Sequence, residues 1–244
     1  MQPLVISHAA CAGHAPENTL AGIRAALRLG ADAIEIDVQA SADSIPVLMH
    51  DLTVDRTTGG RGPVSQLTLD QLRGLDAGGG AQTGGRSPEP VPTLAEVLAL
   101  TKGSALLVVE IKQPGIEEQV AAVVREAGAL SDVMVWSFFA QALAAMRQAE
   151  PLLPTGLLIA PQALPSWPQM REAALRMGLQ AVSVFHAGIT EEIAGQARRS
   201  ALTLYAWTAD AEADIQRLID LGVDGIVTNF PDRALALLGP QRRS

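Results

Sequence analysis

Five residues with side chains suited to catalysis lie at the ends of short apolar runs in the first half of the chain. They are His8 in LVISH, Glu35 and Asp37 in AIEIDV, His50 in IPVLMH, and Glu110 in ALLVVEI. Apolar runs of this length that are rich in Val, Ile and Leu are typical of buried strands. Because a charged group is costly to bury without a partner, several of them at strand ends indicate one shared site.

The three carboxylates indicate a metal site. Glu35 and Asp37 are two residues apart on a predicted strand, so their side chains share one face, and Glu110 occupies a similar place on another strand. Three converging carboxylates repel one another unless they are protonated or bridged by a cation. Oxygen ligands suit a hard divalent cation, Mg²⁺ or Ca²⁺. The alternative is that Glu35 or Glu110 only forms an ion pair with Lys112 or Arg56.

The two histidines indicate acid and base catalysis. Because histidine titrates near neutral pH, His8 and His50 could take a proton from a nucleophile and give one to a leaving group. The pattern does not assign these two roles. The alternative is that each is a hydrogen-bonded histidine at a strand end, and we favour that interpretation for His14 and His186.

Three further residues are candidates for substrate contacts. Lys112, beside the third carboxylate, could bind an anionic oxygen, or it could simply pair with Glu110 or Asp37. Trp207, in LTLYAWT, could form a wall of the substrate cleft or fill the core. Arg56 lies in DRTTGG, which is first of all a turn sequence, although its side chain could reach a phosphate.

Alternating strand and helix patterns predict the scaffold. Strands are expected to begin near residues 4, 33, 105, 133, 155, 180, 202 and 225. Helices are expected over residues 18–30, 94–101, 116–127, 140–149, 167–177, 190–200, 210–221 and 232–238. Eight strand–helix units in about 250 residues predict a (β/α)₈ TIM barrel, with active-site residues at the carboxyl ends of the strands. An open doubly wound sheet is the alternative, although no GxGxxG follows the first strand.

Two local features refine this scheme. Asn18 is the expected N-cap of the first helix, which should stop at Gly30. Residues 39–93 are too long for an ordinary loop, and we expect an inserted subdomain with a short hairpin and a helix at 68–75. This insertion would carry His50, and the whole chain, 1–244, would otherwise be a single barrel domain.

Composition limits the classes of function. The chain has 244 residues, a net charge of −8 and only 3% aromatic residues, which argues against a nucleic-acid-binding surface. A small phosphate ligand stays compatible with this charge if a metal changes the local field. The single cysteine, Cys11, allows no internal disulfide, and no signal peptide or membrane-length apolar run is evident. We expect a cytoplasmic protein, and the oligomeric state is not predicted.

The motifs together resemble those of the glycerophosphodiester phosphodiesterase family. The matching stretches are SHAACAGHAPENTLAGI, GADAIEIDVQ, PVLMHDLTVDRTTGG, VVEIK, YAWTAD and GVDGIVTNFPD. The resemblance implies a metal-dependent barrel hydrolase that cleaves a glycerophosphodiester, such as glycerophosphocholine, to glycerol phosphate and an alcohol. It implies three metal ligands, an acid/base pair and a phosphate contact, which fall on Glu35, Asp37 and Glu110, on His8 and His50, and on Lys112.

One departure from the family pattern affects the expected activity. The family has arginine and glycine directly after the first histidine, whereas this chain has Ala9 and Ala10. The resemblance implies that this arginine contacts the phosphate of the substrate, and loss of such a charged contact to the transition state costs on the order of 10²–10³ in rate. Two other functions therefore stay open: a non-catalytic phosphodiester-binding protein, and a lyase that releases a cyclic phosphate.

Overall fold

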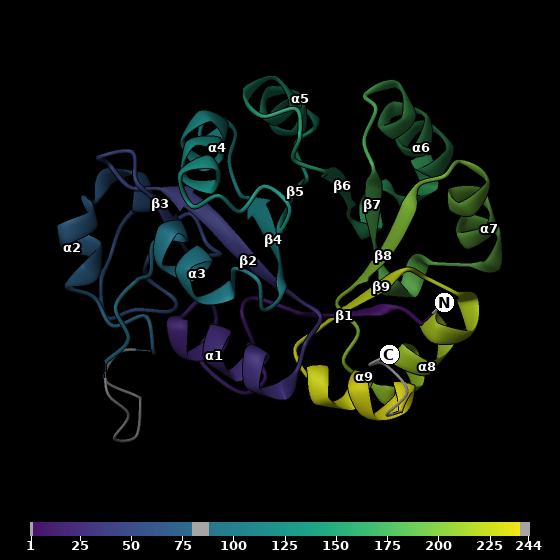
Figure 1. Cartoon of the computed structure of the whole chain (residues 1–244), viewed down its shortest axis with the longest axis horizontal. Coiled ribbons are helices and arrows are strands. Elements are labelled where there is room, and N and C mark those ends of the chain that lie inside the picture. Colours follow the sequence, from purple (N-terminus) through teal and green to yellow (C-terminus); the bar gives the residue numbers. More distant parts are fainter. Residues whose placement is uncertain (1, 80–87, 240–244) are drawn as a thin grey trace.

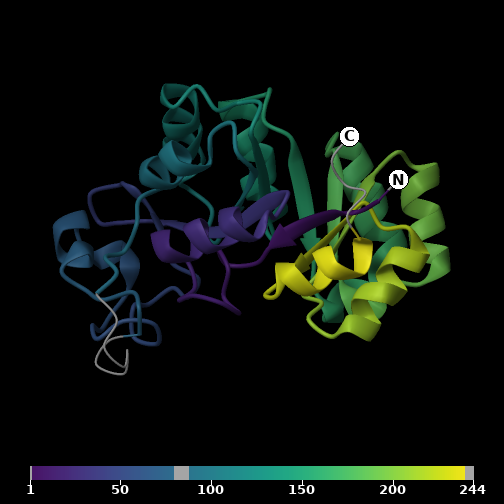
Figure 2. The same ribbon diagram turned by 60° about the horizontal axis from the view of Figure 1, so that its bottom comes forward.

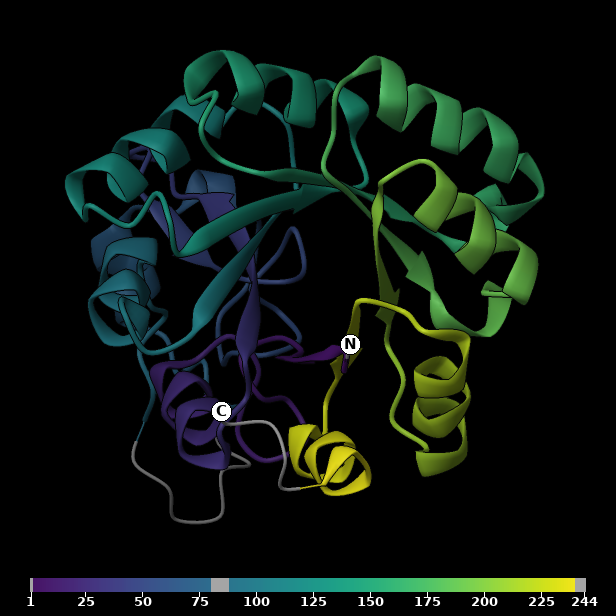
Figure 3. The same cartoon turned by 45° about the vertical axis from the view of Figure 1, so that its right-hand side comes forward.

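The strands form a closed parallel ring (Figures 1 and 3). The computed structural model describes residues 2–79 and 88–239. The ring strands are β1 (Leu4–Ser7), β2 (Ala33–Ala40), β4 (Leu106–Ile111), β5 (Val133–Ser137), β6 (Thr155–Ile159), β7 (Ala181–Phe185), β8 (Thr203–Trp207) and β9 (Gly225–Thr228). Because β1 pairs in parallel with both β2 and β9, the ring has no open edge. The predicted (β/α)₈ barrel is confirmed, and the alternative of an open sheet is wrong.

Helices cover the outside of this ring. They are α1 (Leu20–Leu29), α3 (Leu94–Thr101), α4 (Glu117–Glu126), α5 (Ala140–Ala149), α6 (Trp167–Arg176), α7 (Glu191–Arg199), α8 (Glu212–Leu221) and α9 (Pro231–Leu238), with short 3₁₀ turns at Pro161–Ser166 and His186–Gly188. The predicted helices were therefore placed correctly to within two residues at each end. Among the described residues, none of the helices has the length and apolar character that a membrane crossing requires.

The start of α1 differs from the prediction in a way that matters for the site. The N-cap is Thr19, whose hydroxyl accepts a hydrogen bond from the Gly22 amide, and Gly30 ends the helix in the left-handed conformation as expected. Asn18 is not the cap. Its side chain instead forms hydrogen bonds with Asp37 on β2. A polar side chain that the local sequence predicted at the start of a helix therefore contacts a strand of the site.

Apolar side chains plug the barrel below its carboxyl-end mouth. Inward-facing residues of the strands form one cluster inside the ring: Ile6, Ala33, Val108, Trp136, Leu158, Ala181, Tyr205 and Val227. Ala33 precedes Glu35 by two residues and Val108 precedes Glu110 by two, so each carboxylate shares the inner face of its strand with this cluster. The carboxylates therefore lie one layer nearer the mouth, where barrel enzymes place their sites.

The long connection between β2 and α3 contains its own small elements. β3 (Pro46–Leu48) pairs antiparallel with β2, a 3₁₀ turn covers Val64–Gln66, and α2 (Leu69–Arg73) starts with a Thr68–Gln71 capping box. A separate apolar cluster lies under these elements: Val47, Met49, Val54, Val64, Leu72, Ala77 and Val91. Figures 1 and 2 show β3 and α2 at the end of the molecule opposite α7. These features support the proposed insertion at 39–93, of which 80–87 lie outside the described residues.

Candidate active site

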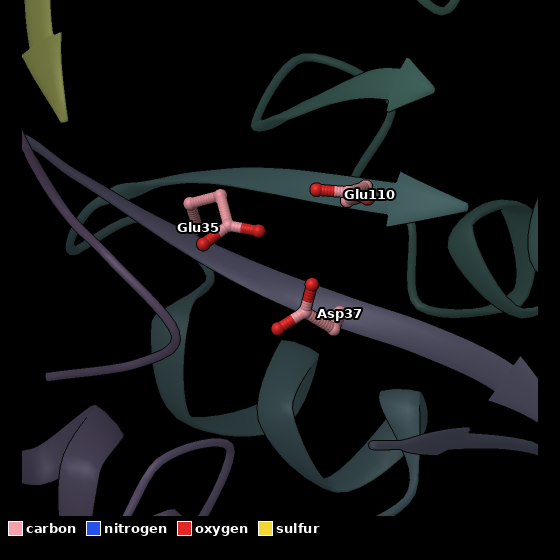
Figure 4. A group of neighbouring side chains, drawn as sticks. All are labelled: Glu35, Asp37 and Glu110. Atoms are coloured by element: carbon pink, nitrogen blue, oxygen red, sulfur yellow. The ribbon is translucent and has the colours of Figure 1, made fainter. Parts of the chain in front are cut away.

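Strand register brings the three carboxylates together. Asp37 on β2 is the direct neighbour of Glu110 on β4 in the ladder, and Glu35 lies two residues before Asp37 on the same face. Their side chains point toward one another (Figure 4), and one oxygen from each lies within 4.8 Å of the others. The convergence that the sequence predicted is therefore present.

The environment of these carboxylates fits a bound cation. Glu35, Asp37 and Glu110 are all buried, and Glu35 Oε1 has no hydrogen-bond partner among the described residues. Burial, followed by repulsion from Asp37, holds the pKa of Glu35 well above its ordinary value and raises the pKa of Glu110 to about 7. A hard divalent cation would offset the burial and the mutual repulsion of these carboxylates. It would also give Glu35 Oε1, which has no hydrogen-bond partner among the described residues, a positively charged partner.

Replacing Glu110 should change how stability depends on pH in the absence of divalent cations. The unfolded carboxyl ionises near 4.5, whereas the folded one keeps its proton up to about 7. Between these values the folded state binds more protons, so the wild type loses stability as the pH rises. We expect Glu110→Gln to avoid this loss, so the two free energies of unfolding should diverge by about 3 kcal/mol. Denaturant titrations from pH 4.5 to 8 measure this difference.

Parallel stability curves for the two proteins would contradict the raised pKa of Glu110. A second set of titrations with saturating Mg²⁺ or Ca²⁺ provides the control. The cation should stabilise the wild type at pH 8 and leave Glu110→Gln much less affected, because the amide removes one charged ligand.

Lys112 pairs with two of the three carboxylates. Its Nζ lies 2.8 Å from Glu110 Oε1 and 3.2 Å from Asp37 Oδ1, so the ion pairs that sequence analysis raised as an alternative are present. Burial disfavours the ammonium, but the two carboxylates outweigh this effect and raise the pKa of Lys112 above its ordinary value. Lys112 also lines the cavity described below, so the same charged group can contact an anionic ligand.

His8 follows β1 and faces the carboxylates from the neighbouring strand. Its Nε2 lies 4.0 Å from Glu35 Oε2, and its Nδ1 lies 2.8 Å from Asn229 Oδ1. Asn229 in turn donates from Nδ2 to Asp210 Oδ2 at 2.7 Å. Asn229 and Asp210 were not among the residues predicted for the site, although both lie in stretches that resemble the family, TNFPD and YAWTAD.

His50 is held by the segment that follows β3. Its Nδ1 lies 2.8 Å from Asp51 Oδ1, and Arg56 donates to Asp51 and to Glu17. Hydrogen bonding from Arg56 is the main cause that lowers the pKa of Asp51 to about 2, so this carboxylate is ionised at neutral pH. The Gln39 side chain also donates to the carbonyl oxygens of Met49 and Asp51, which attaches the segment to the end of β2.

One cavity at the mouth of the barrel joins most of the predicted site residues. Its volume is about 230 Å³, and it is lined by His8, Glu35, His50, Glu110, Lys112, Trp136, Phe138, Leu158, Trp207, Thr208 and Val227. Asp37 is almost completely buried behind Lys112 and is not part of the lining. Trp207 lines this cavity, and its ring contacts Phe138 edge to face at 5.5 Å. It also packs against the apolar cluster inside the barrel, so both roles considered for it from the sequence stay compatible with its position.

A second cavity adjoins the first at the two histidines. It has a volume of about 510 Å³, and its lining includes His8, Ala9, His50, Arg56 and Asn229. Arg56 therefore lies near the site, but its guanidinium is engaged by Glu17 and Asp51. His14 and His186 line neither cavity. His14 Nε2 lies 2.7 Å from Asp232 Oδ1, in agreement with the hydrogen-bonded role favoured for it. His186 Nδ1 lies 3.7 Å from Asp214 Oδ1 and has no hydrogen-bond partner among the described residues, so the same interpretation does not hold for this nitrogen.

Comparison with known proteins places this site in a family. The sequence profile of the Glycerophosphoryl diester phosphodiesterase family matches residues 8–233. The chain belongs to this family. The match includes all eight candidate residues named from the sequence, so the family resemblance inferred from short motifs is confirmed over nearly the whole chain.

Individual relatives of the glycerophosphodiester phosphodiesterase family agree with this assignment. The chain is 37% identical over 246 residues to a glycerophosphodiester phosphodiesterase of Caldanaerobacter subterraneus subsp. tengcongensis, covering 98% of each chain. It is also similar to the crystal structure of a glycerophosphodiester phosphodiesterase from Agrobacterium tumefaciens, with a TM-score of 0.84, 28% identity, and 96% and 99% of the two chains covered. A phosphodiesterase of Oleispira antarctica in complex with the product sn-glycerol-3-phosphate matches with a TM-score of 0.86 and 28% identity, covering 97% of each chain.

Proposed function

We propose that the protein is a glycerophosphodiester phosphodiesterase that hydrolyses its substrate to glycerol phosphate and an alcohol with the help of a divalent cation. The observation that carries this proposal is the set of groups around one cavity: a buried carboxylate cluster, two histidines and a lysine. Family membership and the relative with bound sn-glycerol-3-phosphate support the same substrate class.

The carboxylate cluster would hold Mg²⁺ or Ca²⁺ through Glu35, Asp37 and Glu110. When bound, the cation supplies Lewis-acid stabilisation of the negatively charged phosphate oxygens. Lys112 Nζ would donate to a phosphate oxygen from the same side of the cavity, because its two carboxylate partners keep it charged and orient it there.

The two histidines would move the protons of the reaction. One accepts a proton from the attacking oxygen, and the other donates a proton to the oxygen of the leaving alcohol. Each has its Nδ1 engaged, His8 with Asn229 and His50 with Asp51, so each uses Nε2 for this transfer. The attacking oxygen belongs either to water or to the 2-hydroxyl of the substrate glycerol, and the second path passes through a cyclic phosphate.

The apolar side of the cavity would orient the substrate. Trp207 and Phe138 are in contact in the lining of the cavity, and the Trp207 indole N–H donates to the Ser183 carbonyl at 3.0 Å. That hydrogen bond fixes the indole plane, so the wall is preorganised. The substrate-binding role of Trp207 is part of this proposal.

The direct test is the release of glycerol phosphate from glycerophosphodiesters with added Mg²⁺ or Ca²⁺. We expect turnover that a chelator abolishes. Phosphorus NMR of the product distinguishes hydrolysis, which gives a phosphomonoester, from a lyase reaction, which leaves a cyclic phosphate. Absence of turnover with either metal, together with stabilisation of the protein by glycerophosphocholine, would favour the non-catalytic alternative.

The alanine at position 9, where the family has arginine, favours the non-catalytic alternative and leads to a prediction. Ala9 lines the second cavity together with both histidines, so an arginine side chain can extend into it. Residue 9 has a left-handed φ of 45°, and because alanine already carries a Cβ there, the change to arginine introduces no new type of backbone strain. We expect Ala9→Arg to raise kcat/KM by about tenfold to hundredfold, because the guanidinium can donate to the phosphate in a charge-assisted pair. Steady-state kinetics measure this change.

The matched control for this variant is Ala12→Arg, which places the same side chain on the lining of the same cavity from a different position of the loop after β1. This control should not increase kcat/KM. An equal increase in both variants would show that general electrostatic attraction, and not a phosphate contact from position 9, causes the effect.

A further inference from the structure

The orientation of the Asn229 side chain follows from its partners. Asp210 Oδ2 lies 2.7 Å from Asn229 Nδ2, and Asp210 Oδ1 accepts from the Asn229 amide at 2.8 Å and from the Thr228 hydroxyl at 3.1 Å. Both oxygens of Asp210 accept in these contacts, so its carboxylate faces the NH₂ end of the Asn229 amide. The oxygen end, Oδ1, therefore faces His8.

This orientation determines the tautomer of His8. Asn229 Oδ1 can only accept, so the neutral His8 ring must carry its hydrogen on Nδ1, 2.8 Å away. The lone pair then lies on Nε2, which points toward Glu35 and the cavity. With the hydrogen on Nε2 instead, the ring could not accept a proton on the side where the substrate binds.

We infer that Asn229 and Asp210 are positioning residues that hold His8 with its hydrogen on Nδ1 and its lone pair directed to the reacting phosphate. The role in turnover rests on the proposed phosphodiesterase function, whereas the tautomer itself does not. The two histidines differ in how they are held, since the Nδ1 partner of His50 is the carboxylate of Asp51, whereas that of His8 is an amide that depends on a second residue.

Asp210→Asn tests this arrangement because it changes the direction of one hydrogen bond. The new Oδ1 keeps accepting from the Asn229 amide and the Thr228 hydroxyl, so its NH₂ group faces the Asn229 side chain. Asn229 must then turn its own oxygen toward residue 210 and its NH₂ group toward His8, which moves the His8 hydrogen to Nε2. We expect kcat to fall by about 10²-fold or more, with KM changed much less.

The double variant Asp210→Asn with Asn229→Asp should restore the tautomer. One oxygen of the new carboxylate accepts from the residue 210 amide, and the other accepts from His8 Nδ1. We expect kcat to recover to within about tenfold of the wild type. Asp220→Asn, a carboxylate-to-amide change on α8 outside the site, is the matched control and should leave kcat unchanged.

Nitrogen-15 NMR of the metal-free protein, labelled at histidine, provides a readout independent of activity. The His8 signals are identified by their loss in His8→Asn, and they should show hydrogen on Nδ1 in the wild type and double variant, and on Nε2 in Asp210→Asn. The inference is overturned if Asp210→Asn keeps the Nδ1 hydrogen, or if the double variant is as slow as the single one. If the wild type shows no phosphodiesterase activity, the proposed function fails and the NMR result alone decides the tautomer.

Discussion

Glu35→Gln is expected to abolish tight binding of Mg²⁺ or Ca²⁺ and to lower turnover by about 10³-fold. Glu35 has one oxygen that accepts from the Ala9 amide at 2.8 Å and a second buried oxygen without a hydrogen-bond partner among the described residues. Glutamine can keep the first contact but presents a neutral amide at the second position. Loss of one charged ligand removes several kcal/mol of charge stabilisation from the transition state, which corresponds to a rate change of about this size.

Calorimetric titration with each cation and steady-state kinetics measure the two effects separately. Glu117→Gln is a closely matched control, because Glu117 is also buried, accepts from one backbone amide, that of Gly115, and has a buried oxygen without a partner in the described part of the chain. Glu117 lies on α4 and does not line either cavity at the histidines. Unchanged cation affinity in Glu35→Gln would exclude Glu35 as a ligand.

His50→Ala and His8→Ala are each expected to lower kcat by about 10²–10⁴-fold, because each removes one of the two proton transfers. Cation affinity should stay close to that of the wild type, since neither histidine is needed to hold the metal. The comparison of kcat with calorimetric cation binding therefore separates a catalytic role from a loss of the metal site. His14→Ala is the control, because this histidine pairs with Asp232 and lines neither of the two cavities at His8 and His50.

The same pair of variants can assign the acid and the base. A glycerophosphodiester with nitrophenol as its alcohol has a leaving group that needs little protonation. The variant that lacks the general acid should therefore turn over this substrate at a rate much closer to that of the wild type. The variant that lacks the general base should stay slow with both esters. Equal activity of wild type and His50→Ala with an ordinary glycerophosphodiester would contradict the proposed mechanism.

Much of the scaffold was predictable because it depends on local patterns. All eight ring strands and the surrounding helices follow from apolar runs and helical spacing, which act over a few residues. The first helix shows the limit of this reasoning. Its end at Gly30 could be predicted, because glycine readily adopts the left-handed conformation. Its start at Thr19 could not, because the side chain of Asn18 hydrogen-bonds Asp37, 19 residues away on β2, and does not cap the helix.

The sequence by itself determined the types of the groups proposed for catalysis and metal binding, and their places at strand ends: three carboxylates, two histidines and a lysine. Only the tertiary structure decided their partners. Register places Glu110 beside Asp37, and closure of the barrel brings Asn229 to His8 across 221 positions of the chain. Local propensities determine which face a side chain occupies, whereas contacts between distant strands depend on how the whole ring closes, so no short stretch of sequence contains that information.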